Sequence, residues 1–273
     1  YFIINGKEKV ILSQEKKINN ILYINKSSDP NIILQGVIKS ISNEGYQSSR
    51  TNIISLHKVK IKNEKNVIEL NNILVRILDI DVKVPLFILF KALGANSDKE
   101  IFNLIIYEND SKELKDKLEE HLYYCAKDAQ PIYTQKSAYK FLMVNTKSKE
   151  VINVIDILTN NFLPNYGTNN KLKIQFLAYS VRKLLLTHLK TIKEVDRDSY
   201  SYKRIDLPGS LLLELYRELW GKFIKNTSLT IDKEHKFNFK KIGNDITIII
   251  NENNINNIFD FNIMNTIVKS FGS

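Results

Sequence analysis

The chain has 273 residues and a formal net charge of +10, from 40 Lys and Arg against 30 Asp and Glu. Its 43% of hydrophobic residues suffices for a packed core and excludes wholesale disorder, and its single cysteine excludes an internal disulfide and a cysteine-based zinc site. No apolar run approaches the ~20 residues that span a bilayer, and the N-terminus lacks the features of a signal peptide. We therefore expect a soluble, intracellular protein. The positive charge favours polyanionic partners, but a soluble, Lys-rich surface explains it equally well, and an AT-rich genome that over-uses Asn, Ile and Lys accounts for part of it.

The N-terminal part of the chain is typical of β-structure. Strand-like runs at 1–4 and 9–12 flank Asn5-Gly6, a pair favoured in tight hairpin turns. Further alternating or β-branched runs follow, separated by polar turns. They lie at 21–24, 32–40, 53–61, 67–70 and 73–78.

After Pro85 the apolar residues take helical spacing. The first predicted helix covers 86–93 and ends at Gly94, a residue typical of a helix C-cap. Asp98 is expected to cap the next helix, which carries Ile101. Further helices are expected at 113–122, 137–144, 151–162 (ended by Pro164) and 171–190.

A charged stretch at 190–204 interrupts the helical section. Pro208 and Gly209 then introduce a long helix at 210–225. Residues 233–241 are basic and contain Phe, and 245–251 are expected to form a strand. Strands, then helices, then a charged joint, then a mixed section predict an α+β fold.

Two long stretches resemble the second-largest subunits of multisubunit DNA-dependent RNA polymerases. One is YFIINGKEKV at 1–10, followed by QEK at 14–16, which is similar to a hairpin of that family. The other is DRDSYSYKRIDLPGSLL at 196–212, which is similar to the family's joint in its eukaryotic and archaeal style. Ser199 stands where His is usual and Val195 where a further Asp is common, so roles of those groups do not transfer.

Shorter matches occur in the right order between these two stretches. They are FKALG at 90–94, SDKEI at 97–101, DIL at 156–158 with FLP at 162–164, and FLAY at 176–179 with RKLLL at 182–186. Asn165 replaces the His that follows FLP in the family. The resemblance covers nearly the whole chain and is weakest after about residue 226. Ordered matches of this kind identify the chain as a member of the family.

The resemblance implies a specific architecture. Residues 1–17 would end the first half of a protrusion-type mixed α/β domain, and 201–273 would form its second half. Residues 18–200 would be the lobe, with short β-strands followed by helices, inserted into the protrusion. The chain would then be an internal segment of a longer polypeptide.

The resemblance also implies a function. The whole complex would be a DNA-directed RNA polymerase, a nucleotidyltransferase, in which this segment is non-catalytic, forms a wall of the DNA cleft and docks subunits or transcription factors. Its partners would be the largest and the smaller polymerase subunits, template DNA, the RNA transcript and factors on the lobe, with no membrane. No cofactor is expected in this segment, and the Mg²⁺ of the enzyme would be bound by the largest subunit. Composition favours a large DNA virus as source (virion or cytoplasmic replication site), followed by an AT-rich protist (nucleus).

Basic residues on or near the expected strands and in the charged joint are candidates for contacts to the nucleic-acid backbone. They are Lys9, Lys16, Arg50, Lys203 and Arg204. A solvated strand face explains the hairpin lysines at least as well, so both interpretations stay open.

The charged joint is the second candidate site. Its residues are Asp196, Arg197, Asp198, Asp206 and Gly209. Paired carboxylates could hold a metal or act as acid and base, but the neighbouring cations favour a structural salt-bridge joint. We expect the carboxylates to pair with the arginines and lysine of the same stretch.

No catalytic constellation is evident in the sequence. The histidines, at 57, 121, 188 and 235, lack ligand spacing, and no phosphate-binding loop or nucleophile motif occurs. Two alternatives remain: a free-standing basic nucleic-acid-binding module, and an isolated hydrolase or nuclease, which would need a carboxylate or histidine constellation.

Overall fold

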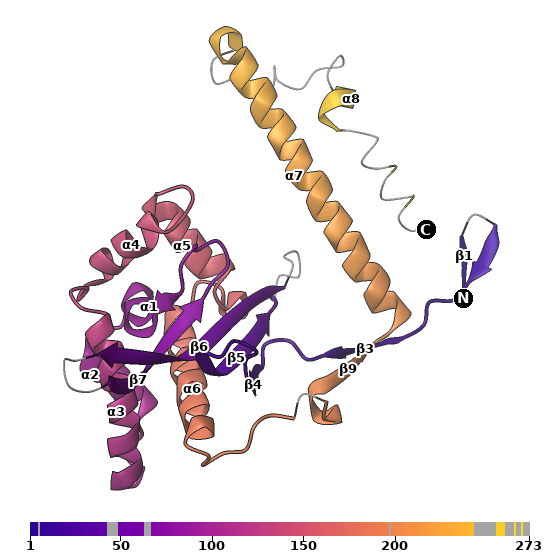
Figure 1. The fold of residues 1–273 in the computed structure, drawn as a ribbon. Helices are drawn as coiled ribbons and strands as arrows, with labels where there is room; N and C mark the ends of the chain where they lie inside the picture. The colour runs from indigo at the N-terminus through magenta and orange to yellow at the C-terminus, as the bar shows by residue number, and fades with distance from the viewer. Residues whose placement is uncertain are drawn as a thin grey trace. The chain divides into compact units, whose positions relative to one another are not determined.

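The computed structural model describes residues 1–4, 6–42, 49–62, 67–196, 198–242, 255–259, 265 and 269. The chain divides into two compact units (Figure 1). Unit 2 comprises Ile18–Asn43 and Ser49–Tyr202, and unit 1 comprises Tyr1–Lys17, Glu44–Ser48 and Lys203–Ser273. Both units combine strands with helices, which confirms the α+β class.

Unit 2 contains a five-stranded antiparallel sheet in the order β4-β5-β6-β7-β8. The strands are β4 (Leu22–Asn25), β5 (Ile32–Ser40), β6 (Arg50–Lys62), β7 (Val67–Arg76) and β8 (Val84–Pro85). Buried Leu34 and Ile38 of β5 lie on one face, as the period of two requires. Gly36 lies opposite Ile24 and against Leu22, where an added Cβ would come within 2.7 Å of the leucine Cδ1. The sheet is therefore close-packed at its β4 edge.

The two runs predicted on either side of Asn71 and Asn72 form one strand, β7. The prediction broke the strand because two consecutive asparagines are typical of a turn. In the folded unit the Asn72 amide donates to Asp128 Oδ2 at 2.8 Å, and the Asn71 amide lies against two histidine rings. Partners from the helices thus bind the side-chain amide nitrogens of both asparagines inside a strand.

Helices follow the sheet in unit 2. They are α1 (Leu86–Leu93), α2 (Asp98–Ile105), α3 (Lys112–Asp128), α4 (Gln135–Val144), α5 (Val151–Asn160) and α6 (Asn170–His188), with 3-10 turns at η1 (Pro164–Tyr166) and η2 (Tyr200–Tyr202). All residues of α1 are buried, since it packs against α3, α4, α6 and β7. Gly94 ends α1 in the left-handed conformation, with φ of 110°, as predicted.

Several helix ends differ from the prediction. Ser97, and not Asp98, caps α2, because its hydroxyl accepts from the Glu100 backbone N–H at 3.2 Å. Helix α5 ends at Asn160, before the predicted stop, and Pro164 begins a 3-10 turn. Helix α3 is longer than predicted at both ends. Helix boundaries depend on caps and tertiary contacts more than on apolar spacing.

The core of unit 2 lies between the sheet and these helices. Its largest fully buried side chains include Phe87, Phe90, Phe162, Ile24 and Leu56. Burying each such side chain contributes about 1.5–3 kcal/mol. One continuous cluster connects the sheet with α1 to α6, so unit 2 carries a complete core.

In the part of unit 1 that the structure describes there are two small antiparallel ribbons and two helices. The elements are β1 (Phe2–Ile4), β2 (Lys7–Lys9), β3 (Gln14–Lys17), β9 (Lys203–Asp206), α7 (Pro208–Ile242) and α8 (Ile255–Ile258). The hairpin β1–β2 is confirmed, but its second strand was predicted two residues too late. Gly6, with φ of 73°, lies in a tight turn that brings Lys7 opposite Ile4.

Helix α7 has 35 residues and extends the predicted helix at both ends. Pro208 is its first residue, a position where the missing N–H of proline costs nothing. The basic stretch 233–241 belongs to this helix, and the strand predicted at 245–251 lies outside the described residues. Strand β9 was not predicted as a strand, because its pairing partner, β3, lies at the other end of the chain.

Candidate functional site

The β3–β9 ribbon brings together Lys16, Lys203 and Arg204, three of the basic candidates. Register pairs Lys16 with Arg204 and Lys17 with Lys203. Like charges directly opposite each other destabilise a ribbon, and a two-stranded ribbon is marginal on its own. The ribbon therefore needs compensating interactions.

Two diagonal ion pairs supply that compensation. The Lys16 ammonium pairs with Asp206, and the Lys203 ammonium lies 2.6 Å from Glu15 Oε1. Lys203 and Asp206 of the joint thus have ion-pair partners on β3, because antiparallel pairing brings β3 side chains close to those of β9. The Arg204 guanidinium donates to the Lys203 carbonyl at 2.7 Å.

Two further joint residues, Asp196 and Asp198, contact each other. The Asp198 N–H donates to the Asp196 carboxylate at 3.0 Å, which closes a short turn in the exposed segment. Arg197 lies outside the described residues. Gly209 is the second residue of α7, and a Cβ added there would meet open space, so no close contact explains the glycine.

Lys9 and Arg50 do not belong to the ribbon. Lys9 ends β2 opposite Phe2, while half-buried Arg50 begins β6 opposite Ser40 in unit 2. The five basic candidates therefore occupy three separate places.

The entry and exit of unit 2 lie side by side. The Ile18 N–H donates to the Tyr202 carbonyl at 2.9 Å. The Tyr23 hydroxyl lies 2.9 Å from the Ile18 carbonyl oxygen, and the rings of Tyr23 and Tyr202 meet edge to face at 5.8 Å. Unit 2 thus begins and ends at one point, as an inserted domain must.

Lys91 and Asp98, from the FKALG and SDKEI matches, form a cross-link in which the lysine is buried and Asp98 is 37% exposed. Lys91, 2% exposed, places its ammonium 2.8 Å from Asp98 Oδ1 and 2.9 Å from the Ile132 carbonyl oxygen. The ring of Tyr133 lies 5.4 Å away. These motif residues join α1 to α2 and to the segment before α4, so their role is structural.

Arg182 of α6 anchors the α2–α3 connection. Its guanidinium donates to both carboxylate oxygens of Asp110, at 2.6 and 2.7 Å, and to the Ile105 carbonyl at 3.0 Å. It also stacks 3.9 Å from the centre of the Tyr107 ring. The hydrogen bonds from Arg182 lower the pKa of Asp110. This bidentate pair fixes the start of α3.

A histidine pair that the sequence did not reveal lies between α3 and α6. The rings of His121 (α3) and His188 (α6) lie 5.3 Å apart, with Asn71 Nδ2 3.2 Å from His121 Nδ1 and 3.5 Å from His188 Nε2. Burial lowers the pKa of both rings, and the neighbouring His121 and Lys58 lower that of His188 further. No spacing signal could have revealed the pair, because its members lie on different helices.

Lys173 is a second buried group that the sequence did not reveal. It lies in α6 with no solvent exposure, and its ammonium donates to the Leu158 and Thr159 carbonyls at 2.6 and 3.0 Å. Burial lowers its pKa to about 8. Lys173 therefore satisfies the C-terminal carbonyls of α5.

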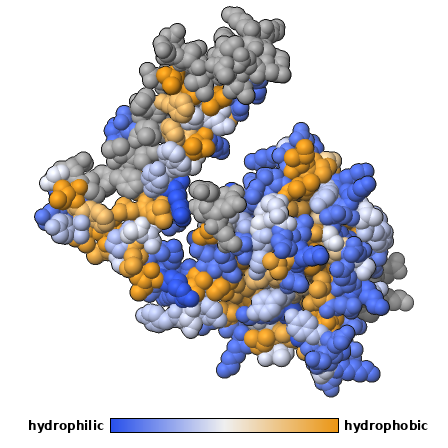
Figure 2. Space-filling model, turned by 180° about the vertical axis from the view of Figure 1, so that it is seen from behind, coloured by the Kyte–Doolittle hydropathy of each residue, from blue (hydrophilic) through white to orange (hydrophobic). Residues whose placement is uncertain are grey.

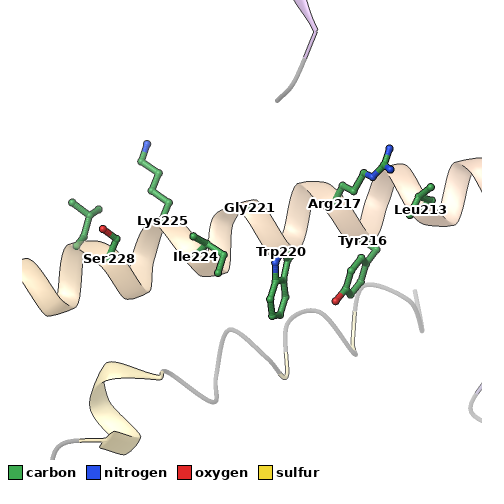
Figure 3. Close-up of a pocket in the computed structure, with 9 residues that line it drawn as sticks. Leu213, Tyr216, Arg217, Trp220, Gly221, Ile224, Lys225 and Ser228 are labelled. Atoms are coloured by element: carbon green, nitrogen blue, oxygen red, sulfur yellow. The ribbon is translucent and has the colours of Figure 1, made fainter. Parts of the chain in front are cut away.

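An apolar stripe is exposed on α7 (Figure 2). Tyr216 and Trp220 stack at 6.0 Å and border a hollow of about 750 Å³. Figure 3 shows these two rings on one side of the helix, with Arg217 and Lys225 on the other. Helix α7 is thus amphipathic, but most of its apolar side chains are not enclosed.

Within the described residues, no group of three or more His, Cys, Asp or Glu side chains is placed to hold a metal ion. In the same part of the chain, no helix has both the length and the apolarity needed to cross a membrane.

Residues 18–206 match the protein family described as RNA polymerase Rpb2, domain 2. Curated relatives align with most of the chain. The DNA-directed RNA polymerase II subunit RPB2 of Encephalitozoon cuniculi is 33% identical over 249 residues, 85% of this chain and 20% of that protein. The corresponding subunit of Eremothecium gossypii is 30% identical over 254 residues, 88% of this chain and 20% of that protein. The archaeal subunit Rpo2 of Sulfolobus acidocaldarius is 24% identical over 241 residues, 85% of this chain and 20% of that protein.

The chain thus spans about 20% of the length of these relatives. The family match begins at Ile18 and ends at Asp206, so it covers unit 2 and strand β9. The resemblance noted in the sequence is confirmed: the chain belongs to the RNA polymerase Rpb2 domain 2 family of second-largest subunits.

Proposed function

We propose that this chain is the non-catalytic lobe, with adjoining parts of the protrusion, of the second-largest subunit of a DNA-directed RNA polymerase. In this assignment residues 1–17 end the first half of the protrusion, 18–200 form the lobe and 201–273 form the second half. The observation that carries the proposal is the family match over 18–206. The adjacency of Ile18 and Tyr202 supports it, because a domain inserted into another needs neighbouring ends.

In the complete polymerase this segment would form a wall of the DNA cleft and dock other subunits and transcription factors. RNA synthesis and its Mg²⁺ would belong to the complex, with the metal held by the largest subunit. The chain's own contribution would be a rigid lobe, held by its continuous core, and a set of basic residues for backbone contacts. The net charge of +10 supports a location near nucleic acid.

Of the basic candidates, Arg204 is exposed on β9, and Lys16 is partly exposed with its charge paired to Asp206. The Lys16 side chain is 42% exposed and that of Asp206 is 13% exposed, so a phosphate would approach the ammonium from the solvent side. Lys203 is less accessible, with 21% of its side chain exposed. Lys9, Lys16 and Arg204 are therefore the first variants to make, followed by Arg50.

The decisive experiment is affinity purification of the parent polypeptide, with mass spectrometry and a promoter-independent transcription assay. Recovery of a largest subunit together with RNA synthesis is the expected result. A solitary protein that binds DNA in a salt-sensitive way and makes no RNA would overturn the proposal and favour a free-standing basic nucleic-acid-binding module.

The DNA contacts are tested in that complex with the triple variant Lys9→Gln, Lys16→Gln and Arg204→Gln. The slope of log affinity against log salt should fall by about 0.9 for each phosphate contact removed. A matched control removes Lys127, Lys136 and Lys140, which are exposed on α3 and α4. An equal change of slope in the control would refute specific contacts at the ribbon and hairpin.

Cellular location follows from the source of the chain. RNA polymerase II subunits from the fungi and plant among the relatives favour a nuclear protein. The large DNA virus predicted from composition remains a hypothesis, and a transcript with spliceosomal introns would contradict it.

A further inference from the structure

A groove of about 690 Å³ lies between α2 and α3 of unit 2. Two helical stripes line it: Lys99 and Phe102 on α2, and Asp116, Glu119, Glu120 and Tyr123 on α3. Lys99 and Phe102 are three residues apart, and the other members of the α3 stripe follow Asp116 by three, four and seven residues, so each stripe lies on one helix face. The groove is therefore formed by two aligned faces rather than by loops.

The buried faces of the two helices hold this groove in place. Ile101 and Ile105 of α2, and Leu118 and Leu122 of α3, have no solvent exposure. The Arg182–Asp110 pair anchors the connection between the helices. Because the inward faces are fixed, the groove is a preformed surface.

The groove is acidic on a basic chain. Three carboxylates face one ammonium there, whereas the whole chain carries +10. Asp116 lies three residues before Glu119 and four before Glu120, and like charges at this spacing destabilise a helix. No ion pair of the described residues neutralises any of the three carboxylates. A cationic occupant would relieve that repulsion.

Two aromatic rings accompany the carboxylates. Tyr123 is 71% exposed at the rim, and half-buried Phe102 packs on Phe87 at a ring distance of 5.7 Å. Aromatic faces attract ammonium and guanidinium groups, and the methylene stems of Lys and Arg pack on such rings. Nucleic acid is disfavoured here, because its phosphates would meet carboxylates.

We propose that the α2–α3 groove binds a lysine- and arginine-rich segment of a partner protein. Basic side chains of the segment pair with Asp116, Glu119 and Glu120, and one stem or cation packs on Tyr123. The proposal rests on the docking role in the proposed function and specifies the partner's chemistry and its place on the lobe.

The test uses the full 273-residue chain and a fluorescein-labelled synthetic peptide of alternating lysine and leucine, followed by fluorescence anisotropy. A glutamate–leucine peptide of equal length is the probe control. We expect the lysine peptide to bind in a salt-sensitive way. The triple variant Asp116→Asn, Glu119→Gln and Glu120→Gln should weaken binding about tenfold, from three exposed charge pairs.

The matched control variant is Asp81→Asn, Glu150→Gln and Asp156→Asn, which removes three carboxylates at exposed positions outside the groove. It should bind the lysine peptide like the native chain. Tyr123→Ala should weaken binding about threefold without a change in thermal unfolding, since this ring is largely exposed. Equal weakening by both triple variants, or equal binding of the glutamate peptide, would overturn the proposal.

The same groove variant in the parent polypeptide separates this proposal from the proposed function. RNA synthesis in the promoter-independent assay should persist, while cross-links from p-benzoylphenylalanine in place of Tyr123 should reach a Lys- and Arg-rich peptide of another protein. Cross-links to nucleic acid or to an acidic peptide would overturn the groove proposal alone. Failure of the unmodified parent to assemble a polymerase would overturn the proposed function. Peptide binding by the chain would then still be decided by the anisotropy measurement.

Discussion

Units 1 and 2 contain similar local sequence patterns, but their apolar side chains are buried to different extents. In unit 2, strands and helices share one continuous core, and even the eight residues of α1 are all buried. In unit 1, the buried cluster of the described residues is Leu219 and Phe223, with Leu215 against them. Trp220 and Ile224 of the same helix remain 37% and 51% exposed. An amphipathic helix thus becomes part of a core only where other elements close over its apolar face.

This difference determines where stability is located. Most helical stability in proteins comes from packing rather than from helix propensity. We therefore expect unit 2 to unfold as a cooperative body and α7 to depend far more on contacts with other molecules or segments. The chain contains a single tryptophan, Trp220 in α7, whose fluorescence reports on unit 1. Amide exchange of β5 to β7 reports on unit 2.

The largest contrast should come from removing one phenylalanine from each unit. Phe87→Ala leaves a cavity at a fully buried site and should cost about 3–5 kcal/mol in the free energy of unfolding of unit 2. Phe223→Ala, at a site that is 7% exposed but belongs to a cluster of three described residues, should cost less than Phe87→Ala. Urea unfolding followed by both probes measures the two. Equal costs would show that unit 1 has a core comparable with that of unit 2.

Removing one ion pair from each unit should give the second-largest difference in the free energy of unfolding. Arg182→Met leaves the Asp110 carboxylate, 10% exposed, without its bidentate partner and should destabilise unit 2 by about 3 kcal/mol. Lys203→Met breaks a pair in which Glu15 is 47% exposed and should cost about 0–1 kcal/mol. Because Arg182 lowers the pKa of Asp110, its stabilisation should be lost as pH falls through that lowered pKa. Retention of the acid response in Arg182→Met would contradict this assignment.

Because Lys173 is buried in unit 2, we expect the stability of unit 2 to change with pH in the alkaline range. Its pKa of about 8 lies below the ordinary 10.5, so the unfolded chain binds more protons between these values and stability should rise with pH there. The gain is at most about 3 kcal/mol at 1.36 kcal/mol per pKa unit. Lys173→Met should abolish the rise, whereas Lys171→Met, at an exposed position, should keep it. The same slope in both variants would refute the assignment.

The smallest expected effect concerns the histidine pair. Burial lowers the pKa of His121 and His188 below 6.5, so the unfolded chain binds protons first as pH falls below that value. Unit 2 should therefore lose about 1 kcal/mol per unit of pKa shift in mild acid. Replacing both histidines with Gln should reduce this loss of stability, whereas His235→Gln in α7 should not. Amide exchange of β7 between pH 7 and 5 is the measurement.

Local sequence patterns predicted the parts of the fold that depend on neighbours along the chain. The hairpin around Gly6, strand β5 and helix α1 with its Gly94 cap follow from turn chemistry and periodicity. The ordered motifs identified the family, and the structure explains some of them physically. Lys91 and Asp98, for example, belong to different matches and form one ion pair between α1 and α2.

Other features could not be predicted because their cause lies far away in the sequence. Asn71 and Asn72 were taken for a turn, since nothing nearby shows that helix α3 and His188 supply their partners. Lys203 was expected to pair within its own stretch and Lys16 was given no partner, although β3 and β9 pair Lys16 with Asp206 and Lys203 with Glu15. The acidic stripe of α3 was not predicted to be a binding site, because the residues that face it lie on another helix, α2.

The sequence by itself determined the fold class, most element types and the family, because periodicity, caps and ordered motifs are properties of short segments. The tertiary structure alone decided which segments meet: the pairing of β3 with β9, the adjacency of Ile18 and Tyr202, and the convergence of His121 and His188. The physical reason is that these contacts depend on strand register and on the closing of the core, both of which arise only when distant segments pack together.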